Sequence, residues 1–356
     1  MKNIKITDER WFRAMKTLLA LLIALLITFI TLCFTSETPM QSFITMLTAP
    51  LTKMRYFCNV LEMSVPIIFT ALGCAILFRS GVFNLGGEGI FYICGIATAF
   101  FATQIQGLNS FFHPIFTIIA VSLLGGLLMM IPGFLQVKFQ TNIVLSSLML
   151  NSIYTGVGLW LLKTYMLATD ISITASPLFV ETVKLPYLFK GTRITVGFFL
   201  AIIAVVLINV IISHTRLGYK IRMTGINPDF ANYSGIRAFS LFLIIHFISG
   251  CLIGVGASVE LLSLYDRFTW TTIMPQQATT GMLIAMMGNN KPIPVLIAAL
   301  GISYLKIGAE IMSRSTSVPV EIISIVEATL VLLISAKYFL GRLRERQMMK
   351  EVLADG

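Results

Sequence analysis

The sequence predicts an all-α, polytopic membrane protein of about ten transmembrane helices, with broken or short helices around a central pathway. Of its 356 residues, 56% are hydrophobic and only 12% are charged, whereas ordinary soluble domains carry about 25% charged residues. Apolar runs of about 18 residues or more recur along the chain, each long enough to cross a hydrocarbon core of ~30 Å. Glycines and prolines interrupt several of these runs.

We expect the spans at roughly 14–36, 59–78, 88–105, 114–135, 143–163, 194–213, 238–260, 273–288, 293–312 and 320–340. Breaks are expected at Pro66, Pro132, Pro275 and the glycines of 81–89. Helix breaks at membrane depth are tolerated only where protein or a water-filled cavity covers the freed backbone. They therefore predict an inward-facing pathway. The whole chain, 1–356, is read as one transmembrane domain with an outer loop at about 164–193 and an inner loop at about 214–237.

The basic residues predict the orientation. With the N-terminus inside, most of the 26 Lys and Arg residues fall in the inner segments, which is the bias that membrane proteins show. Ten spans then return the C-terminus to the same side, so both termini are expected in the cytoplasm. The net charge of +10 is attributed to these loops and to contact with membrane lipid, and not to nucleic acid.

Motifs for chemistry are missing from the sequence. It contains no phosphate-binding G-x-x-x-x-G-K-[ST] loop, no H-E-x-x-H, no G-x-S-x-G and no His or Cys set with metal-ligand spacing. We therefore expect no catalytic residue, no metal and no cofactor. His246, inside a predicted span, is expected to be a hydrogen-bonded packing residue and not a pore residue.

The stretch RSGVFNLGGEG, 79–89, places polarity and four glycines between two apolar runs. A break there lets a helix begin inside the bundle, with free N–H donors and partial positive charge at its start. Asn84 and Glu88 add hydrogen-bonding groups suited to a neutral solute. Glu88 has a second interpretation, which we favour: a structural cap on the first turn of its own helix.

Asn151 lies in another apolar run, and buried polar groups in lipid are costly without partners. It is therefore expected to face the interior together with the 79–89 break. Asn142, near a span end, is expected to be a helix cap. The predicted pathway residues are Phe83, Asn84, Glu88, Phe91, Asn151, Gln276 and Gln277, with the two phenylalanines as stacking walls and the two glutamines as the weaker candidates.

The inner loop contains a helix-start signal. Asn227 can cap free N–H groups, Pro228 suits the first turn, and Gly235 suits a helix end. We expect a short exposed helix over about 228–234. Two interpretations remain open: a surface helix that orders the loop, or a docking helix for a cytoplasmic partner.

Three stretches resemble one family. GVFNLGGEG is close to G-L-F-N-I-G-A-E-G, TNIVLSSLMLN (141–151) is similar to N-E-V-I-x-T-x-M-L-N, and the loop 217–236 follows a pattern ending N-P-x-A-A-x-Y-x-G-I. The combination resembles permease subunits of ATP-binding cassette importers, in the simple-sugar and nucleoside branch related to ribose and branched-chain amino-acid permeases. Phe230 and Ile90 depart from the pattern, as does most of 274–288.

The resemblance implies a permease that is not itself an enzyme, in a bacterial cytoplasmic membrane. It implies a separate ATP-binding subunit, a second permease that is identical or related, and an extracytoplasmic substrate-binding lipoprotein. Nucleosides are the expected cargo, with riboflavin or a simple sugar as alternatives. An alternative from another class is an ion-gradient-driven secondary transporter that uses Glu62, Glu260, Glu310, Glu321 or Glu327. The residues expected to couple to the ATPase are Gly225, Asn227, Pro228, Tyr233 and Gly235.

Overall fold

The computed structural model describes residues 23, 25–105, 107–188, 192–236, 238–270 and 276–316. These residues are helical apart from loops and two isolated β-bridges, Ala175–Thr269 and Tyr187–Thr195. An apolar helix at Leu25–Thr35 comes first. The helices that follow are α2 (Pro39–Thr52), α3 (Met54–Arg79), α4 (Gly87–Gln104), α5 (Phe112–Phe139), α6 (Ile143–Tyr165), η1 (Glu181–Val183), α7 (Val196–His214), α8 (Arg216–Ile226), α9 (Pro228–Tyr233), α10 (Ala238–Leu264), α11 (Gln277–Met287) and α12 (Pro292–Ser315).

The all-α prediction is confirmed for this part of the chain, whereas the count of ten spans is not. Six helices among the described residues are long and apolar enough to cross a membrane: α3, α5, α6, α7, α10 and α12. The predicted span 320–340 and residues 14–22 and 24 of the predicted span 14–36 lie outside the described residues. The predicted span 273–288 contains α11, whose 11 residues rise only about 16 Å.

Two predicted breaks are wrong. Pro66 lies inside α3 and Pro132 inside α5, and neither interrupts its helix. Proline is tolerated inside membrane helices because neighbouring groups can satisfy the freed carbonyl. Pro275 lies outside the described residues. The glycine-rich break is confirmed, since α3 ends at Arg79, Gly81 has φ +82°, and α4 begins only at Gly87.

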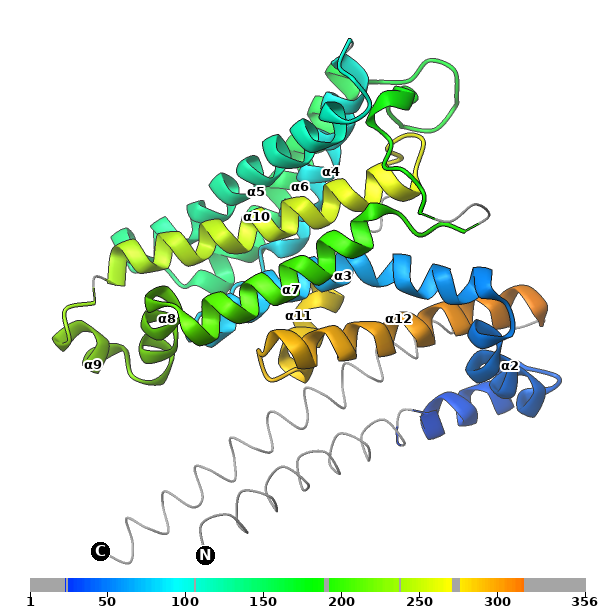
Figure 1. The fold of residues 1–356 in the computed structure, drawn as a ribbon, viewed down its shortest axis with the longest axis horizontal. Coiled ribbons are helices and arrows are strands. Elements are labelled where there is room, and N and C mark those ends of the chain that lie inside the picture. The colour runs from blue at the N-terminus through cyan, green and yellow to red at the C-terminus, as the bar shows by residue number, and fades with distance from the viewer. Residues whose placement is uncertain are drawn as a thin grey trace, which may run out of the picture. The chain divides into compact units, whose positions relative to one another are not determined.

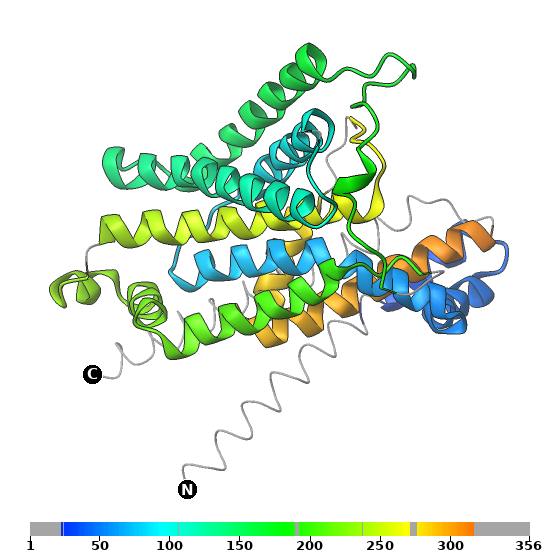
Figure 2. The same cartoon turned by 45° about the horizontal axis from the view of Figure 1, so that its top comes forward.

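Residues 57–303 form one compact unit, in which α4 contacts α5, α6, α10 and α11. Helices α5 and α10 run side by side (Figures 1 and 2), because glycines meet between them. A Cβ on Gly125 would lie 2.6 Å from the Gly250 carbonyl oxygen. α3 is the most buried of the six candidate spans and α6 the least.

The second unit comprises residues 1–56 and 304–356. Within it, the Tyr304 hydroxyl donates a hydrogen bond to the Leu47 carbonyl, and Gly308 packs closely against the Met46 carbonyl. These two contacts join α2 to the second half of α12. Helix α2 is not predicted by the sequence analysis.

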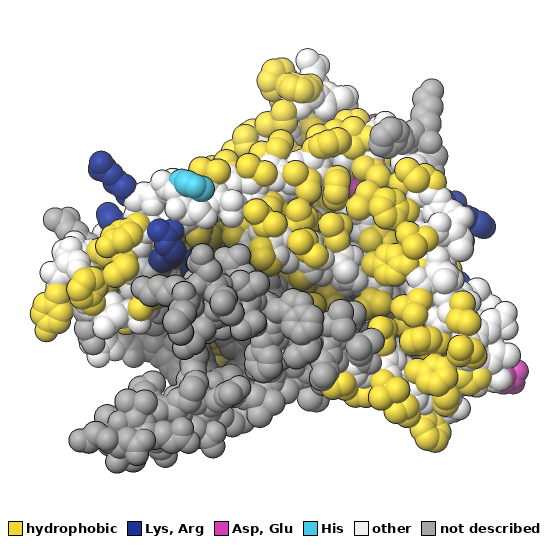
Figure 3. Space-filling model, turned by 60° about the horizontal axis from the view of Figure 1, so that its bottom comes forward, with side chains coloured by type: hydrophobic (Ala, Val, Ile, Leu, Met, Phe, Trp, Pro, Cys, Tyr) yellow, Lys and Arg dark blue, Asp and Glu magenta, His cyan; other side chains and the backbone are white. Residues whose placement is uncertain are grey.

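Apolar side chains dominate the described surface in Figure 3, and Lys and Arg gather toward its margins. Large hydrophobic residues are exposed along the helices that could span a membrane, for example Leu145, Trp160, Ile203 and Ile297. A hydrocarbon environment removes the cost of exposing such residues. The surface therefore fits a protein embedded in lipid.

Candidate functional site

The break between α3 and α4 is closed by its own polar side chain. Asn84 is 2% exposed, and its Oδ1 accepts a hydrogen bond of 2.7 Å from the Gly86 N–H. This is an Asx turn, which bends the chain into the start of α4. The Asn84 amide nitrogen, Nδ2, is buried without a hydrogen-bond partner.

Helix α6 clamps the break with two side chains. The Ser147 hydroxyl accepts from the Leu85 N–H at 3.1 Å. Asn151 accepts from the Gly89 N–H at 2.9 Å through Oδ1 and donates to the Leu85 carbonyl at 2.9 Å through Nδ2. The first-turn N–H groups of a helix have no partner within the helix, and Asn151 supplies one. Both of its polar side-chain atoms therefore bind the backbone of the break.

Glu88 joins the starts of two helices. Its Oε2 accepts from the Thr279 N–H at 2.9 Å and from the Thr279 hydroxyl at 3.1 Å. Thr279 lies in the first turn of α11, and a Cβ on Gly87 would lie 3.2 Å from the Ala278 Cβ. Helices α4 and α11 therefore begin at the same place inside the bundle, which we call the polar junction.

The expected capping role of Glu88 within its own helix is therefore wrong. The carboxylate caps α11, a helix that lies far along the chain. The reason is local competition: Asn151 already satisfies the N–H of Gly89 in the first turn of α4. An anionic group at the start of α11 also lies at the positive end of that helix.

Gln277 completes the polar junction. Its Nε2 donates to Glu260 Oε1 at 3.0 Å, and its carbonyl accepts from the Thr70 hydroxyl at 3.1 Å. Its side-chain Oε1 is buried without a partner. Gln276, one residue earlier, is exposed and has φ +57°.

Three buried polar atoms at the junction lack hydrogen bonds: Asn84 Nδ2, Glu88 Oε1 and Gln277 Oε1. The three residues are 2%, 8% and 8% exposed, so bulk water does not cover them. A buried polar group without a partner costs about 1–3 kcal/mol. The junction therefore holds one donor and two acceptors that no protein group among the described residues satisfies.

The two phenylalanines named from the sequence lie apart from this hydrogen-bonded set. Phe83 is 41% exposed and stacks on Phe78, with ring centroids 4.9 Å apart. Phe91 is buried in the packing of α4. The sequence analysis did not name Thr279, Ser147 or Glu260 at the junction. Their part in it depends on contacts between helices that no local motif encodes.

The other carboxylates proposed as ion sites are engaged elsewhere. Glu62 accepts from the N–H and hydroxyl of Thr195, at 3.1 and 3.0 Å, and so caps the start of α7. Glu310 lies 3.7 Å from Arg314, and Glu321 and Glu327 lie outside the described residues. Among the residues that the structure describes, no group of three or more His, Cys, Asp or Glu could hold a metal ion.

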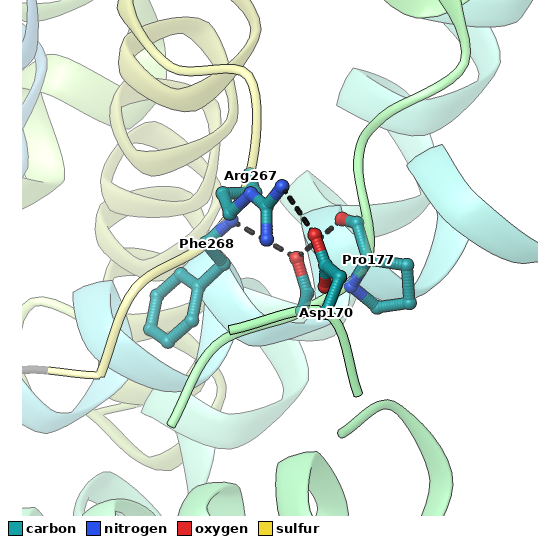
Figure 4. Close-up of polar contacts among 5 residues, drawn as sticks. Asp170, Pro177, Arg267 and Phe268 are labelled. Carbon is teal, nitrogen blue, oxygen red and sulfur yellow. Dashed lines mark hydrogen bonds and ion pairs between the residues drawn. The ribbon is translucent and has the colours of Figure 1, made fainter. Parts of the chain in front are cut away.

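The loop between α6 and α7, which was predicted at about 164–193 and is described here at 166–188, is tied to the segment 265–270 that follows α10. Figure 4 shows the Arg267 side chain reaching Asp170 of this loop, while the ring of Phe268 points away from the loop. Arg267 pairs with Asp170 at 2.9 Å, and its guanidinium holds the pKa of that carboxyl below its usual value. Lys184 lies 2.7 Å from Asp266, which together with Glu181 raises the pKa of its ammonium.

The inner helix predicted from Asn227 and Pro228 is confirmed. The Asn227 side chain caps α9 by accepting from the Phe230 N–H at 3.0 Å, and Gly235 ends the turn with φ +77°. Helix α8, which precedes it, was not expected. Four large apolar side chains of α8 and α9 are exposed outside the candidate spans: Tyr219 (53%), Ile226 (79%), Phe230 (51%) and Tyr233 (92%). The last three follow one another within eight residues, and we call them the apolar patch.

Gly225 connects this region to the break. It packs closely against the Arg79 carbonyl, with the Ser80 carbonyl carbon 3.2 Å from the position of a Cβ. Arg79 in turn donates from Nη1 to the Asn290 carbonyl at 3.3 Å. The end of α8, the end of α3 and the turn after α11 therefore meet at one place.

The chain is similar to a known permease family and to individual transporter subunits. A family model described as the branched-chain amino acid transport system / permease component matches residues 56–335. The nucleoside ABC transporter permease protein NupB of Lactococcus lactis is 29% identical over 286 residues, 77% of this chain and 78% of that protein. The guanosine ABC transporter permease protein NupP of Bacillus subtilis is 26% identical over 299 residues, covering 82% and 85%. The glucose ABC transporter permease protein TsgB13 of Haloferax volcanii is 24% identical over 348 residues, covering 95% and 91%.

Proposed function

The chain belongs to the family of branched-chain amino acid transport system permease components, and we propose that it is the membrane-spanning subunit of an ATP-driven importer for nucleosides. The observation that carries the proposal is the polar junction, where two helices begin inside an apolar bundle beside unpaired polar atoms. Transport sites in membrane proteins are commonly built at such interrupted helices.

The cargo is a neutral solute. Glu88 already occupies the positive end of α11, and Glu260 lies on Gln277 of the same turn. A phosphate or carboxylate brought to this place would meet those two side chains instead of free N–H donors. Asn84, Glu88 and Gln277 contact the solute, Asn151 positions the break, and Gln276 and Phe83, whose side chains are exposed, line the route. The similarity to nucleoside and guanosine permeases supports nucleosides.

The apolar patch on α8 and α9 is the ATPase docking surface. Exposed apolar groups outside the lipid-facing helices mark interaction sites, and this patch lies beside the contact between Gly225 and Arg79. Docking there moves the end of α3, and with it the break. Asn227, Pro228 and Gly235 set the shape of α9, while Tyr233 supplies the contact.

The complex contains two permeases, one or more cytoplasmic ATP-binding subunits and an extracytoplasmic binding lipoprotein, in a bacterial cytoplasmic membrane with both termini of this chain inside. ATP hydrolysis belongs to the separate subunit. This arrangement makes the ion-driven alternative unnecessary, because Glu62 and Glu260, two of its candidate carboxylates, have hydrogen-bond partners within the fold.

The specificity of the partner binding protein tests the cargo. Titration calorimetry with guanosine, inosine, uridine, glucose, ribose and riboflavin is expected to show tight binding of nucleosides only. A sugar as the sole ligand would favour the function named for the Haloferax volcanii relative, and riboflavin as the sole ligand would favour the flavin alternative. Either result would contradict nucleosides as the cargo.

A further inference from the structure

Three aromatic rings meet about one helical turn from Glu88. Tyr92 follows Glu88 by four residues in α4, so it lies on the same face, about 6 Å further along the helix. Its ring is edge-on to Phe268, with centroids 5.5 Å apart, and to Trp270, with centroids 4.9 Å apart. No sequence motif pointed to these three residues, which come from α4 and from the segment after α10.

The non-helical segment 265–270 is held firmly in place. The Ser176 N–H donates to the Phe268 carbonyl at 2.8 Å, and the Phe268 N–H donates to the Ser176 hydroxyl at 3.0 Å. The Trp270 N–H donates to the Thr174 carbonyl at 2.8 Å. Gly95 leaves room for the Phe268 ring, which lies 3.2 Å from the position of a Cβ there. The two rings are therefore fixed by backbone hydrogen bonds.

The three rings differ in exposure. Tyr92 and Phe268 are 3% and 6% exposed, whereas Trp270 is only half-buried. The indole is thus the ring that keeps a free surface, and the other two support it. From Trp270 the chain runs on through 271–275 to the start of α11, where Gln277 Oε1 lacks a partner.

We propose that Trp270, supported by Tyr92 and Phe268, is the ring-binding half of the transport site. The unpaired atoms of Glu88, Gln277 and Asn84 are its polar half. A ligand that fits both halves carries a flat heterocyclic ring next to hydroxyl or amide groups, since aromatic rings pair well with the indole. The inference rests on the proposed permease function and assigns recognition of the base of the nucleoside to Trp270.

Tryptophan fluorescence tests the contact directly. The chain has three tryptophans, so Trp11→Phe with Trp160→Phe leaves Trp270 as the only tryptophan of the permease. The same transporter with Trp270→Phe added gives the emission of the partner subunits, which is subtracted. Guanosine is expected to quench its emission in a saturable way, and ribose is not. The matched control keeps Trp160, which is 56% exposed on α6, and is expected to show no response to guanosine. Unchanged Trp270 emission in a protein that still imports guanosine would overturn the proposal.

Replacement of the ring gives a second readout. Trp270→Leu is expected to lower guanosine uptake about tenfold or more, while Trp270→Phe, which keeps a ring, stays within about threefold of the wild type. Equal uptake by the Leu variant and the wild type would contradict the proposed ring-binding site but would not contradict the proposed permease function. Uptake of glucose or ribose by the wild type, without any nucleoside uptake, would instead contradict the proposed cargo and the ring site together.

Discussion

At the scale of single residues, the break depends on close backbone contacts as well as on polar side chains. A Cβ on Gly89 would lie 2.6 Å from the Asn151 Cα and 2.9 Å from its carbonyl oxygen. Both atoms belong to the backbone of α6 and cannot rotate away. Only glycine therefore allows Asn151 to reach the N–H of Gly89.

Gly89→Ala is expected to destabilise the folded protein by about 1–3 kcal/mol, because the added methyl group forces α4 and α6 apart. Thermal unfolding in detergent measures the loss. Gly156→Ala is the matched control, since nothing lies within 4 Å of the Cβ position at that glycine in α6. Equal melting temperatures for the two variants would contradict the close approach of α4 and α6.

The ion pairs that hold the loop 166–188 against residues 265–270 are expected to persist over a broad pH range. The pKa of Asp170 is lowered, so its pair with Arg267 is complete above the ordinary Asp value of about 3.9 and is lost as pH falls through the lower folded value. The pKa of Lys184 is raised, so its pairs are complete below about 10.4 and are lost only above the raised folded value. Protease cleavage of residues 166–188 should therefore be equally slow from about pH 5 to 9. A steep rise in cleavage between pH 6 and 8 would show that another group controls the loop.

At the scale of elements, the local sequence predicts the structure of the loop 214–237 better than it predicts the structure of the long apolar helices. Asn227, Pro228 and Gly235 predict α9 because capping is a short-range property. Helices α2 and α8 were not predicted, because both are too short to appear in the sequence as long apolar runs. Pro66 and Pro132 were expected to break their helices, but bundle packing overrides that local preference.

Tyr233→Ala is expected to uncouple ATP hydrolysis from transport, because it removes the most exposed ring of the apolar patch. The variant should insert normally, retain basal ATPase activity in the complex and lose most of the stimulation by the solute-loaded binding protein. Tyr165→Ala is the control, since Tyr165 is 59% exposed at the end of α6. Normal stimulation and uptake in the Tyr233 variant would exclude docking through this ring.

At the scale of the whole molecule, the orientation rests on α7 crossing the membrane between the outer loop and α8. Single cysteines at position 187, where Tyr187 is 61% exposed, and at position 232, in α9, are expected to react with impermeant maleimide from opposite sides. A Cys33→Ser background removes the exposed native thiol. Labelling of both positions from the same side would show that α7 does not cross.

The site illustrates which parts of this molecule its sequence could predict. The glycines and Asn84 marked the break, because local backbone freedom and polarity within an apolar run are visible in one stretch. The partner of Glu88 was not visible, since Thr279 lies 191 residues away and no local rule links the two. Tyr92, Phe268 and Trp270 were missed for the same reason. Their contacts depend on how the outer loop fixes the segment after α10.

Nucleoside uptake into proteoliposomes tests the central claim most directly. The permease is reconstituted with its ATP-binding subunits, ATP is trapped on the side of the ATPase, and binding protein with radiolabelled guanosine is added to the other side. The account predicts that guanosine accumulates against its gradient only when ATP, the ATPase subunit and the binding protein are all present. Accumulation by the permease alone under an imposed ion gradient, or no ATP-dependent accumulation of any nucleoside, would contradict it.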